Sequence, residues 1–379
     1  MRRFLFKCKQ SIAFIPSLMA LGYALFAITI HLLPTSWTHP DIDWLIVQDN
    51  DDTLNVLLTL ILGIFTIIVF SYSMVMNAIT TAISVYSARL VPMLLRDKAH
   101  QLILGSALGT LVFMLIQVVA VTTEIPGNQI TPLITPLSVL FTIATIVIFA
   151  YFLHHASDSV QVNYVLHRAY TTSHQQLDRV MQRKNQLVDH KVPSDFQVVL
   201  RAQRPGYVQP LDIEHLLKRI GKKSQSLQVI PYPGQFVNFG DPLLATSDVS
   251  CWSPRALRNM VIVAHNVPLD LFDTGIKHLT EVAVKAQSSA INDPGTTLTA
   301  LDYLSQALID RIPVPNFTGI KTGDQTLYIT HLRTDFMFEW TVRELDSFIQ
   351  DDPIVVARYE AMLKRIAYNG DRYGSFVEK

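Results

Sequence analysis

Charged residues are scarce in this chain of 379 residues, and neither sign is in excess. Asp, Glu, Lys and Arg together make up 16% of the sequence, against about 25% in ordinary soluble domains, whereas 49% is hydrophobic. The 31 basic residues balance the 31 acidic ones, so no global basic excess favours a nucleic-acid partner. Cys8 and Cys251 are the only cysteines. We place them in or beside a reducing compartment and expect no disulfide.

Sequence motifs of catalysis are also missing. The chain has no P-loop, no Gly-rich dinucleotide fingerprint after a strand, and no HExxH or CxxC. His154 and His155 are adjacent, so on a helix they point about 100° apart and cannot chelate one metal as an i, i+4 pair could. Cys251 has no partner in the sequence that marks it as a nucleophile. We therefore expect no enzyme, no catalytic residue, no metal site and no cofactor.

Long apolar runs are concentrated in the first 155 positions. Four of them match the roughly 20 residues that cross a bilayer as a helix. They predict spans at about 13–33, 54–80, 102–122 and 132–153. The first run is longer than the apolar core of a signal peptide, about 7 to 15 residues, so we interpret it as an uncleaved membrane helix. Residues 1–156 are thus predicted to form a transmembrane block.

Basic residues alternate across these spans. They occur in the segment before the first span, in the loop after the second and in the region after the fourth. The loop after the first span instead carries five aspartates, from Asp41 to Asp52, and neither Lys nor Arg. By the positive-inside rule, both termini are predicted to be cytoplasmic.

A polar stripe marks the second span and its extension beyond the membrane. Its members recur every three or four residues and share one helical face: Ser73, Asn77, Thr80, Ser84 and Ser87. Polar side chains in a span usually face a bundle interior or a cavity. Hydroxyls can also bond to the carbonyl four residues back, so Asn77 is the more informative member. Both a pore lining and interhelical hydrogen bonding fit this pattern.

Small residues mark the third span. Gly105 and Gly109 form a small-xxx-small arrangement, which lets another helix approach closely, and Gln117 is a lone amide in the same span. We expect helix packing at this face, including contacts between subunits.

Residues 157–379 have the composition of soluble protein. We expect a cytoplasmic helical linker at 157–191, a β-rich module at 192–250 and a mainly helical domain at 251–379, with a strand near 325–330. The strings GYVQPL and PGQFVNFGDPLL resemble half-motifs of the barrel-sandwich fold of biotinyl and lipoyl carriers. Carriers need a lysine on an exposed hairpin, whereas the lysines here fall in a polar run, so we expect a structural module. The predicted fold is a mainly α membrane protein with a cytoplasmic α+β region.

One turn in the helical region has a distinctive composition. Asn292, Asp293 and Pro294 separate two amphipathic segments, and Asp293 or Thr296 can cap the helix that follows. We interpret this turn as structural.

Several strings carry a family resemblance. SARLVPMLLRD, QLILGSALGT, HHASDSVQV, PGYVQPLD and SSAINDPGTTLTALD resemble the bacterial predicted-membrane-protein family catalogued as domain of unknown function 2254. The resemblance covers nearly the whole chain and implies a multi-pass protein of the bacterial inner (plasma) membrane. It implies no biochemical activity.

Two classes of function fit the sequence. The first is an oligomeric channel or pore for small ions, lined by the polar stripe and regulated by the cytoplasmic domain. The alternative is a non-transporting regulatory or scaffold protein anchored in the membrane. No charged residue lies inside the spans, which argues against a proton-coupled transporter. The expected partners are the lipid bilayer, further copies of the chain in a homo-oligomer and, for the first class, small ions.

Overall fold

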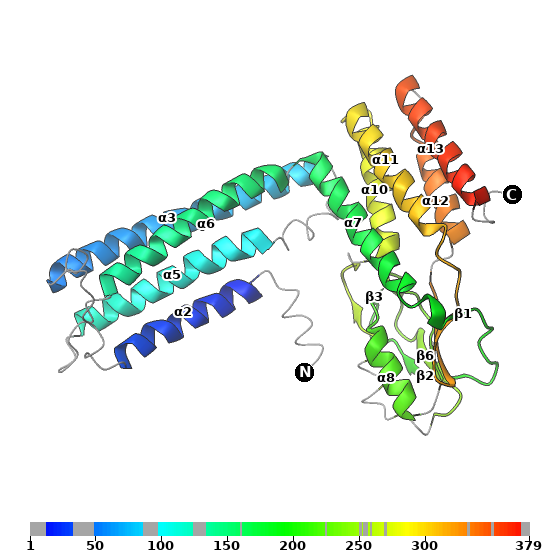
Figure 1. Ribbon diagram of the computed structural model, residues 1–379, viewed down its shortest axis with the longest axis horizontal. Coiled ribbons are helices and arrows are strands. Elements are labelled where there is room, and N and C mark those ends of the chain that lie inside the picture. The colour runs from blue at the N-terminus through cyan, green and yellow to red at the C-terminus, as the bar shows by residue number, and fades with distance from the viewer. Residues whose placement is uncertain are drawn as a thin grey trace. The chain divides into compact units, whose positions relative to one another are not determined.

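The computed structural model describes residues 13–32, 49–85, 98–123, 134–159, 161–223, 226–249, 252, 257, 260–268, 271–331, 334–349 and 352–372. These residues fall into two compact units (Figure 1). Unit 1 ends at Gln161 and unit 2 begins at Val162, apart from a few isolated positions. Both cysteines, Cys8 and Cys251, lie outside the described residues, so the expected absence of a disulfide stays a prediction.

Unit 1 consists of four long helices: α2 (Phe14–Leu32), α3 (Asn50–Val85), α5 (Lys98–Thr122) and α6 (Ile134–Ser159). By length and composition, all four are able to cross a membrane. This confirms the four apolar spans predicted from the sequence, with ends moved by a few residues. The 36 residues of α3 reach about 54 Å, well beyond the roughly 30 Å hydrocarbon core of a bilayer.

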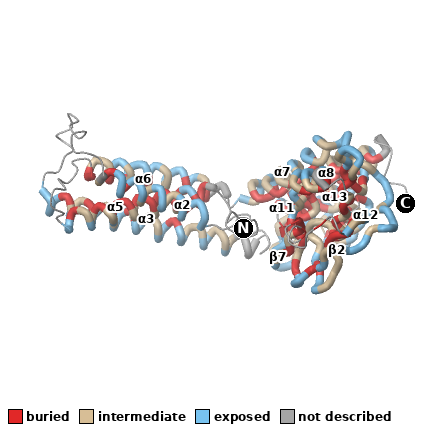
Figure 2. Tube along the Cα trace, turned by 90° about the horizontal axis from the view of Figure 1, so that it is seen from below, coloured by how far each residue is buried: buried red, intermediate tan, exposed pale blue. Residues whose placement is uncertain are grey.

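Aromatic contacts hold the centre of unit 1 together. Helix α5 packs against both α2 and α6 (Figure 1). The ring of Phe113 on α5 lies 4.9 Å from Phe141 on α6 and 6.2 Å from Phe26 on α2, measured between centroids. Helix α3 contacts α6 through Phe70 and Phe149, whose centroids are 5.9 Å apart. Most of the span on α3 remains exposed in the single chain, as the pale segments of Figure 2 show.

The helical part of unit 2 contains α7 (Val162–Met181), α10 (Phe272–Ala286), α11 (Pro294–Arg311), α12 (Thr334–Asp346) and α13 (Pro353–Arg372). Helix α10 packs against α7, α11 and α12, and α11 also packs against α7 and α13. Helix α7 is amphipathic, and its buried residues share one face of the helix: Val165, Leu166, Ala169, Ser173 and Leu177. The helical part of the predicted linker thus packs against the C-terminal helices.

The remaining elements of unit 2 are short. They are η4 (Lys184–Gln186), β1 (Leu187–Val188), β2 (Gln197–Arg201), β3 (Gly206–Val208), α8 (Ile213–Lys223), β4 (Leu227–Val229), β5 (Phe236–Val237), β6 (Pro242–Thr246), β7 (Val263–Ala264), β8 (Gly319–Thr322) and β9 (Gln325–Ile329). A six-stranded sheet has the order β1-β8-β9-β4-β6-β2, and a three-stranded sheet has the order β5-β3-β7. Among the strand pairs of the described residues, β4–β9 alone is parallel.

Strand pairing does not confirm the expected barrel-sandwich fold. The two resembling strings do meet, because Gly206 of β3 pairs with Val237 of β5. However, β6 pairs with β2 and β4 in the other sheet. That sheet also takes in β8 and β9, which follow the predicted boundary at residue 250 by about 70 residues in the chain. The expected strand near residue 325 is present as β9.

Candidate functional site

The predicted polar stripe lies on the exposed side of α3. Ser73, Asn77 and Thr80 are all exposed in the single chain. The hydroxyl of Ser73 donates to the carbonyl of Val69 at 3.0 Å, and that of Thr80 donates to the carbonyl of Met76 at 3.0 Å. The side chain of Ser84 and the whole of Ser87 lie outside the described residues.

The polar stripe extends further towards the start of α3 than predicted from the sequence. Thr59 and Thr66 are also exposed and donate to the carbonyls four residues back, at 2.8 Å each. Together with Ser73 and Thr80 they form a repeat of seven residues along one face. The seven-residue spacing is visible in the sequence and would have revealed the two additional members.

Asn77 differs from the hydroxyl members of the stripe. Its side chain is exposed, and within the described part of the chain it makes no hydrogen bond. An amide cannot be satisfied as readily as a hydroxyl by the carbonyls of its own helix. Asn77 is therefore the member of the stripe that needs a partner from outside the single chain.

The two predicted packing glycines face α2 of the same chain. A Cβ placed on Gly105 would lie 2.5 Å from Met19 Sδ, and one placed on Gly109 would lie 2.7 Å from the ring of Tyr23. No larger residue fits at either position without movement of α2 or its side chains. This face is therefore occupied within the subunit, and a contact between subunits needs a different surface.

Buried polar side chains on α5 and α6 include Gln117, already noted in the third span, and three that were not predicted: Ser106, Thr110 and Thr145. Thr110 and Thr145 are 0% and 1% exposed, and their hydroxyl oxygens lie 3.0 Å apart. Thr145 donates to the carbonyl of Phe141, so Thr110 must be the donor between the two. Ser106, Thr110 and Gln117 recur at spacings of four and seven, a signal that the sequence contains.

Gln117 meets a residue that the sequence analysis did not consider. It is fully buried, and its Oε1 lies 2.8 Å from Nε2 of His31, in the last turn of α2. The two residues are 86 positions apart in the chain, so no local pattern connects them.

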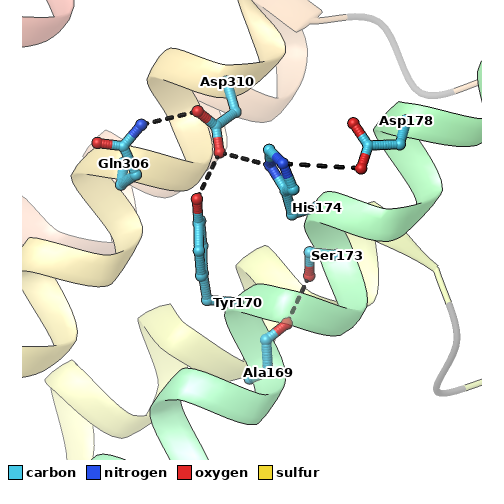
Figure 3. A network of polar contacts seen from close by, with 7 residues as sticks. All are labelled: Ala169, Tyr170, Ser173, His174, Asp178, Gln306 and Asp310. Carbon is cyan, nitrogen blue, oxygen red and sulfur yellow. Dashed lines mark hydrogen bonds and ion pairs between the residues drawn. The ribbon is translucent and has the colours of Figure 1, made fainter. Parts of the chain in front are cut away.

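A carboxylate joins α7 to α11 in unit 2 (Figure 3). Oδ2 of Asp310 accepts a hydrogen bond from the hydroxyl of Tyr170 at 2.9 Å and lies 2.8 Å from Nδ1 of His174. Its Oδ1 accepts from the amide of Gln306 at 2.7 Å. On the far side of the imidazole, Nε2 lies 3.8 Å from a carboxylate oxygen of Asp178. The network thus connects two consecutive turns of α7 to the end of α11.

The electrostatics of this network favour a structural role. Burial, reinforced by the hydrogen bond to Asp310, raises the pKa of Tyr170 to about 12. Tyr170 therefore keeps its proton and remains a donor at physiological pH. Asp310 has partners at both oxygens and is 15% exposed, so it has little capacity left for a substrate. The arrangement anchors α7 to α11 rather than forming a reaction centre.

The predicted family turn joins α10 to α11. Asn292 has a φ of 46°, in the left-handed region that asparagine tolerates better than most residues. Asp293 is the N-cap of α11, accepts a hydrogen bond from the backbone N–H of Thr296 at 3.1 Å, and also accepts from the Thr296 hydroxyl. These bonds lower the pKa of Asp293. Pro294 occupies the first turn of the helix, where its missing N–H costs nothing.

Two partly buried titratable groups of unit 2, Asp273 and His331, have shifted pKa values. Burial raises the pKa of Asp273 to about 6, although Arg311 and Lys277 attract its charged form. Burial and nearby Arg311 lower the pKa of His331 to about 4. Among the described residues, no group of three His, Cys, Asp or Glu side chains is placed to hold a metal ion.

The four apolar helices of unit 1 indicate, by length and composition, a multi-pass membrane protein. The chain belongs to the family described as Predicted membrane protein (DUF2254), whose model matches residues 9–365. Uncharacterised proteins of Mycobacterium tuberculosis and Mycobacterium bovis are each 23% identical to it over 347 residues. The match covers 86% of this chain and 66% of each relative, just under two thirds of their length. No solved structure matches.

Proposed function

We propose that the protein is a homo-oligomer of the bacterial inner membrane, whose subunits meet along the polar stripe of α3 and enclose a path for small ions. The observation that carries the proposal is the exposed amide of Asn77 on a membrane helix. An amide without a partner in hydrocarbon costs several kcal/mol, roughly 4 to 8 by transfer to an apolar solvent. A second copy, or water between copies, removes that cost.

The geometry of α3 is compatible with such an assembly. Thr59, Thr66, Ser73 and Thr80 repeat every seven residues, the period that keeps one face of a helix against a neighbour in left-handed packing. The centre of unit 1 is filled by fully buried side chains, among them Phe113 and Met114. A path for ions is therefore placed between subunits rather than through the middle of one.

Unit 2 is assigned to regulation in this proposal. Only two residues separate the end of α6 from the start of α7 in the sequence. Helix α7 is in turn tied to α11 through Tyr170, His174 and Asp310. A ligand that moves α10 or α11 would therefore act on the helix that directly follows the last span.

The test is ion flux into liposomes that contain the purified protein, combined with a measurement of its oligomeric state. For Asn77→Leu we expect the oligomer to persist and flux to fall at least severalfold, because the substitution removes the amide and narrows the path. Met76→Leu is the matched control, since Met76 is an exposed neighbour on the same helix, and it should leave flux unchanged. Flux by the wild type equal to that of protein-free liposomes contradicts the channel.

The second candidate is a membrane-anchored regulatory or scaffold protein that transports nothing. One observation favours it: each described hydroxyl of the stripe is already hydrogen-bonded within α3 and needs no water. Asn77 would then bond to its counterpart in a neighbouring subunit. In that case Asn77→Leu dissociates the oligomer, and neither protein gives flux above protein-free liposomes.

The orientation has its own test. We propose that both termini and unit 2 are cytoplasmic, with the loop after α2 outside. The native cysteines are first removed by Cys8→Ser and Cys251→Ser. In this background, Asp49→Cys should react with an impermeant thiol reagent in intact cells. Asp324→Cys, at an exposed position in unit 2, should react only after lysis. The reverse pattern excludes this topology.

A further inference from the structure

His31 and Gln117 form a polar contact between α2 and α5 in unit 1. Nε2 of His31 lies 2.8 Å from Oε1 of Gln117. An amide oxygen only accepts hydrogen bonds, so Nε2 of the imidazole carries the hydrogen and donates it. In neutral His31, the other ring nitrogen then has a free lone pair.

Each residue retains a buried polar atom without a partner. Within the described part of the chain, neither Nδ1 of His31 nor Nε2 of Gln117 makes a hydrogen bond. If the amide oxygen and nitrogen of Gln117 are exchanged, the amide N–H donates to Nε2 of His31. The unsatisfied donor is then Nδ1 of His31, and the unsatisfied acceptor is the amide oxygen. Both arrangements leave one donor and one acceptor unsatisfied, in a place where each such group costs about 1 to 3 kcal/mol.

A neutral group that can both donate and accept suits each of these two atoms, whichever way the amide is assigned. A cation or an anion at either atom would need a counter-charge beside it. The described side chains in the core around these helices are apolar, Ile30, Met114 and Val121 among them, so none of these offers a counter-charge. A hydroxyl group meets both requirements.

We propose that the His31–Gln117 pair is a binding site for a hydroxyl group, supplied either by a buried water or by the glycerol headgroup of a lipid. His31 lies in the last turn of α2, which ends at Leu32, so the site is close to one end of the helix, where headgroups and water are within reach. Such a hydroxyl bonds to a polar atom that the described residues of α2 and α5 leave unsatisfied.

The experiment is nuclear magnetic resonance on the full chain in lipid nanodiscs, with ¹⁵N-labelled Gln and His. The side-chain amide of Gln117 is identified by its loss in Gln117→Met, while Leu115→Met, on the exposed side of α5, leaves it in place. We expect a through-space cross-peak from this amide to hydroxyl protons. Opposite signs of the laboratory-frame and rotating-frame peaks separate contact from chemical exchange.

Two membranes distinguish the sources. If the hydroxyl belongs to water, the cross-peak appears at the water frequency in both phosphatidylcholine and phosphatidylglycerol. If it belongs to lipid, the cross-peak appears only with phosphatidylglycerol, whose headgroup has hydroxyls. Absence of both peaks in both membranes overturns the proposal.

A second measurement does not depend on any variant folding. In the wild type, the ¹⁵N resonance of Nδ1 of His31 should have the shift of a nitrogen in a hydrogen bond. The shift of a bare lone pair in both membranes likewise overturns the proposal.

Discussion

Gly275 on α10 lies directly against Ser173 on α7: a Cβ placed on this glycine would overlap the Ser173 hydroxyl oxygen and would lie 3.1 Å from the carbonyl oxygen of Ala169. Ser173 is 1% exposed and donates to that same carbonyl at 2.8 Å. The crossing of α7 and α10 therefore depends on the absence of a side chain at position 275. This contact therefore helps to hold α7, the first helix of unit 2, against α10.

Gly275→Ala should lower the free energy of unfolding of the full chain by about 1 to 3 kcal/mol, because the new methyl group overpacks the crossing. Gly221→Ala is the matched control, since Gly221 is an exposed helical glycine with nothing within 4 Å of an added Cβ. The control should be neutral or more stable by up to about 1 kcal/mol. Denaturant unfolding in detergent micelles measures both, and equal effects of the two substitutions would contradict the close crossing.

Gly109→Ala should weaken the packing of α2 on α5 in unit 1. The added Cβ meets the ring of Tyr23 at 2.7 Å, so the ring or the whole helix must move, at a cost of about 1 to 3 kcal/mol. Gly22→Ala, on the open side of α2, is the control and should not destabilise. A disulfide between cysteines placed at Tyr23 and Gly109 would report the same proximity. Failure of that bridge to form under oxidation would argue against the contact.

Asp293→Ala should destabilise the protein by about 1 kcal/mol through loss of the N-cap of α11. Asp293→Asn keeps a side-chain oxygen that can accept a hydrogen bond from the backbone N–H of Thr296, so it should lose much less stability than Asp293→Ala. The depressed pKa of Asp293 means that its stabilising contribution is present above the ordinary carboxyl pKa and is lost as the pH falls through the lower folded value. If Asp293→Asn and Asp293→Ala unfold at the same denaturant concentration, capping is not the role of this residue.

The pH dependence of stability should reveal Asp273 and His331 as two opposing groups. Folding raises the pKa of Asp273 from 3.8 to about 6, so the folded state holds the proton more tightly, and stability falls as pH rises through that window. Folding lowers the pKa of His331 from 6.5 to about 4, so stability rises with pH over nearly the same window. A shift of about two pKa units corresponds to at most about 3 kcal/mol, and the two effects should largely offset each other in the wild type.

Single substitutions separate these two groups. Asp273→Asn should leave a stability that increases from pH 4 to pH 6.5, and His331→Phe should leave one that decreases over the same range. Thermal unfolding of each full-length variant at several pH values gives the two slopes. Slopes of the same sign in both variants would exclude the assigned shifts.

The sequence by itself determined the features that depend on local patterns. Apolar length defined four spans, because about 20 apolar residues are needed whatever surrounds them. The order Asp293, Pro294 and Thr296 predicted a capped helix start, since a cap involves atoms only three residues apart. The described hydroxyls of the stripe, Ser73 and Thr80, bond to carbonyls four residues back within α3, as the sequence analysis allowed for hydroxyl groups.

Only the tertiary structure decided which distant segments meet. The spacing of Gly105 and Gly109 predicts that another helix packs closely there, but no local pattern identifies α2 as that helix. Tyr170 and Asp310 are 140 residues apart, and β4 finds its parallel partner in β9, about 100 residues later. Such pairings depend on how all the apolar faces of the chain are buried together. The spacing of residues along one segment predicts which of its faces is buried, but not which other segment packs against that face.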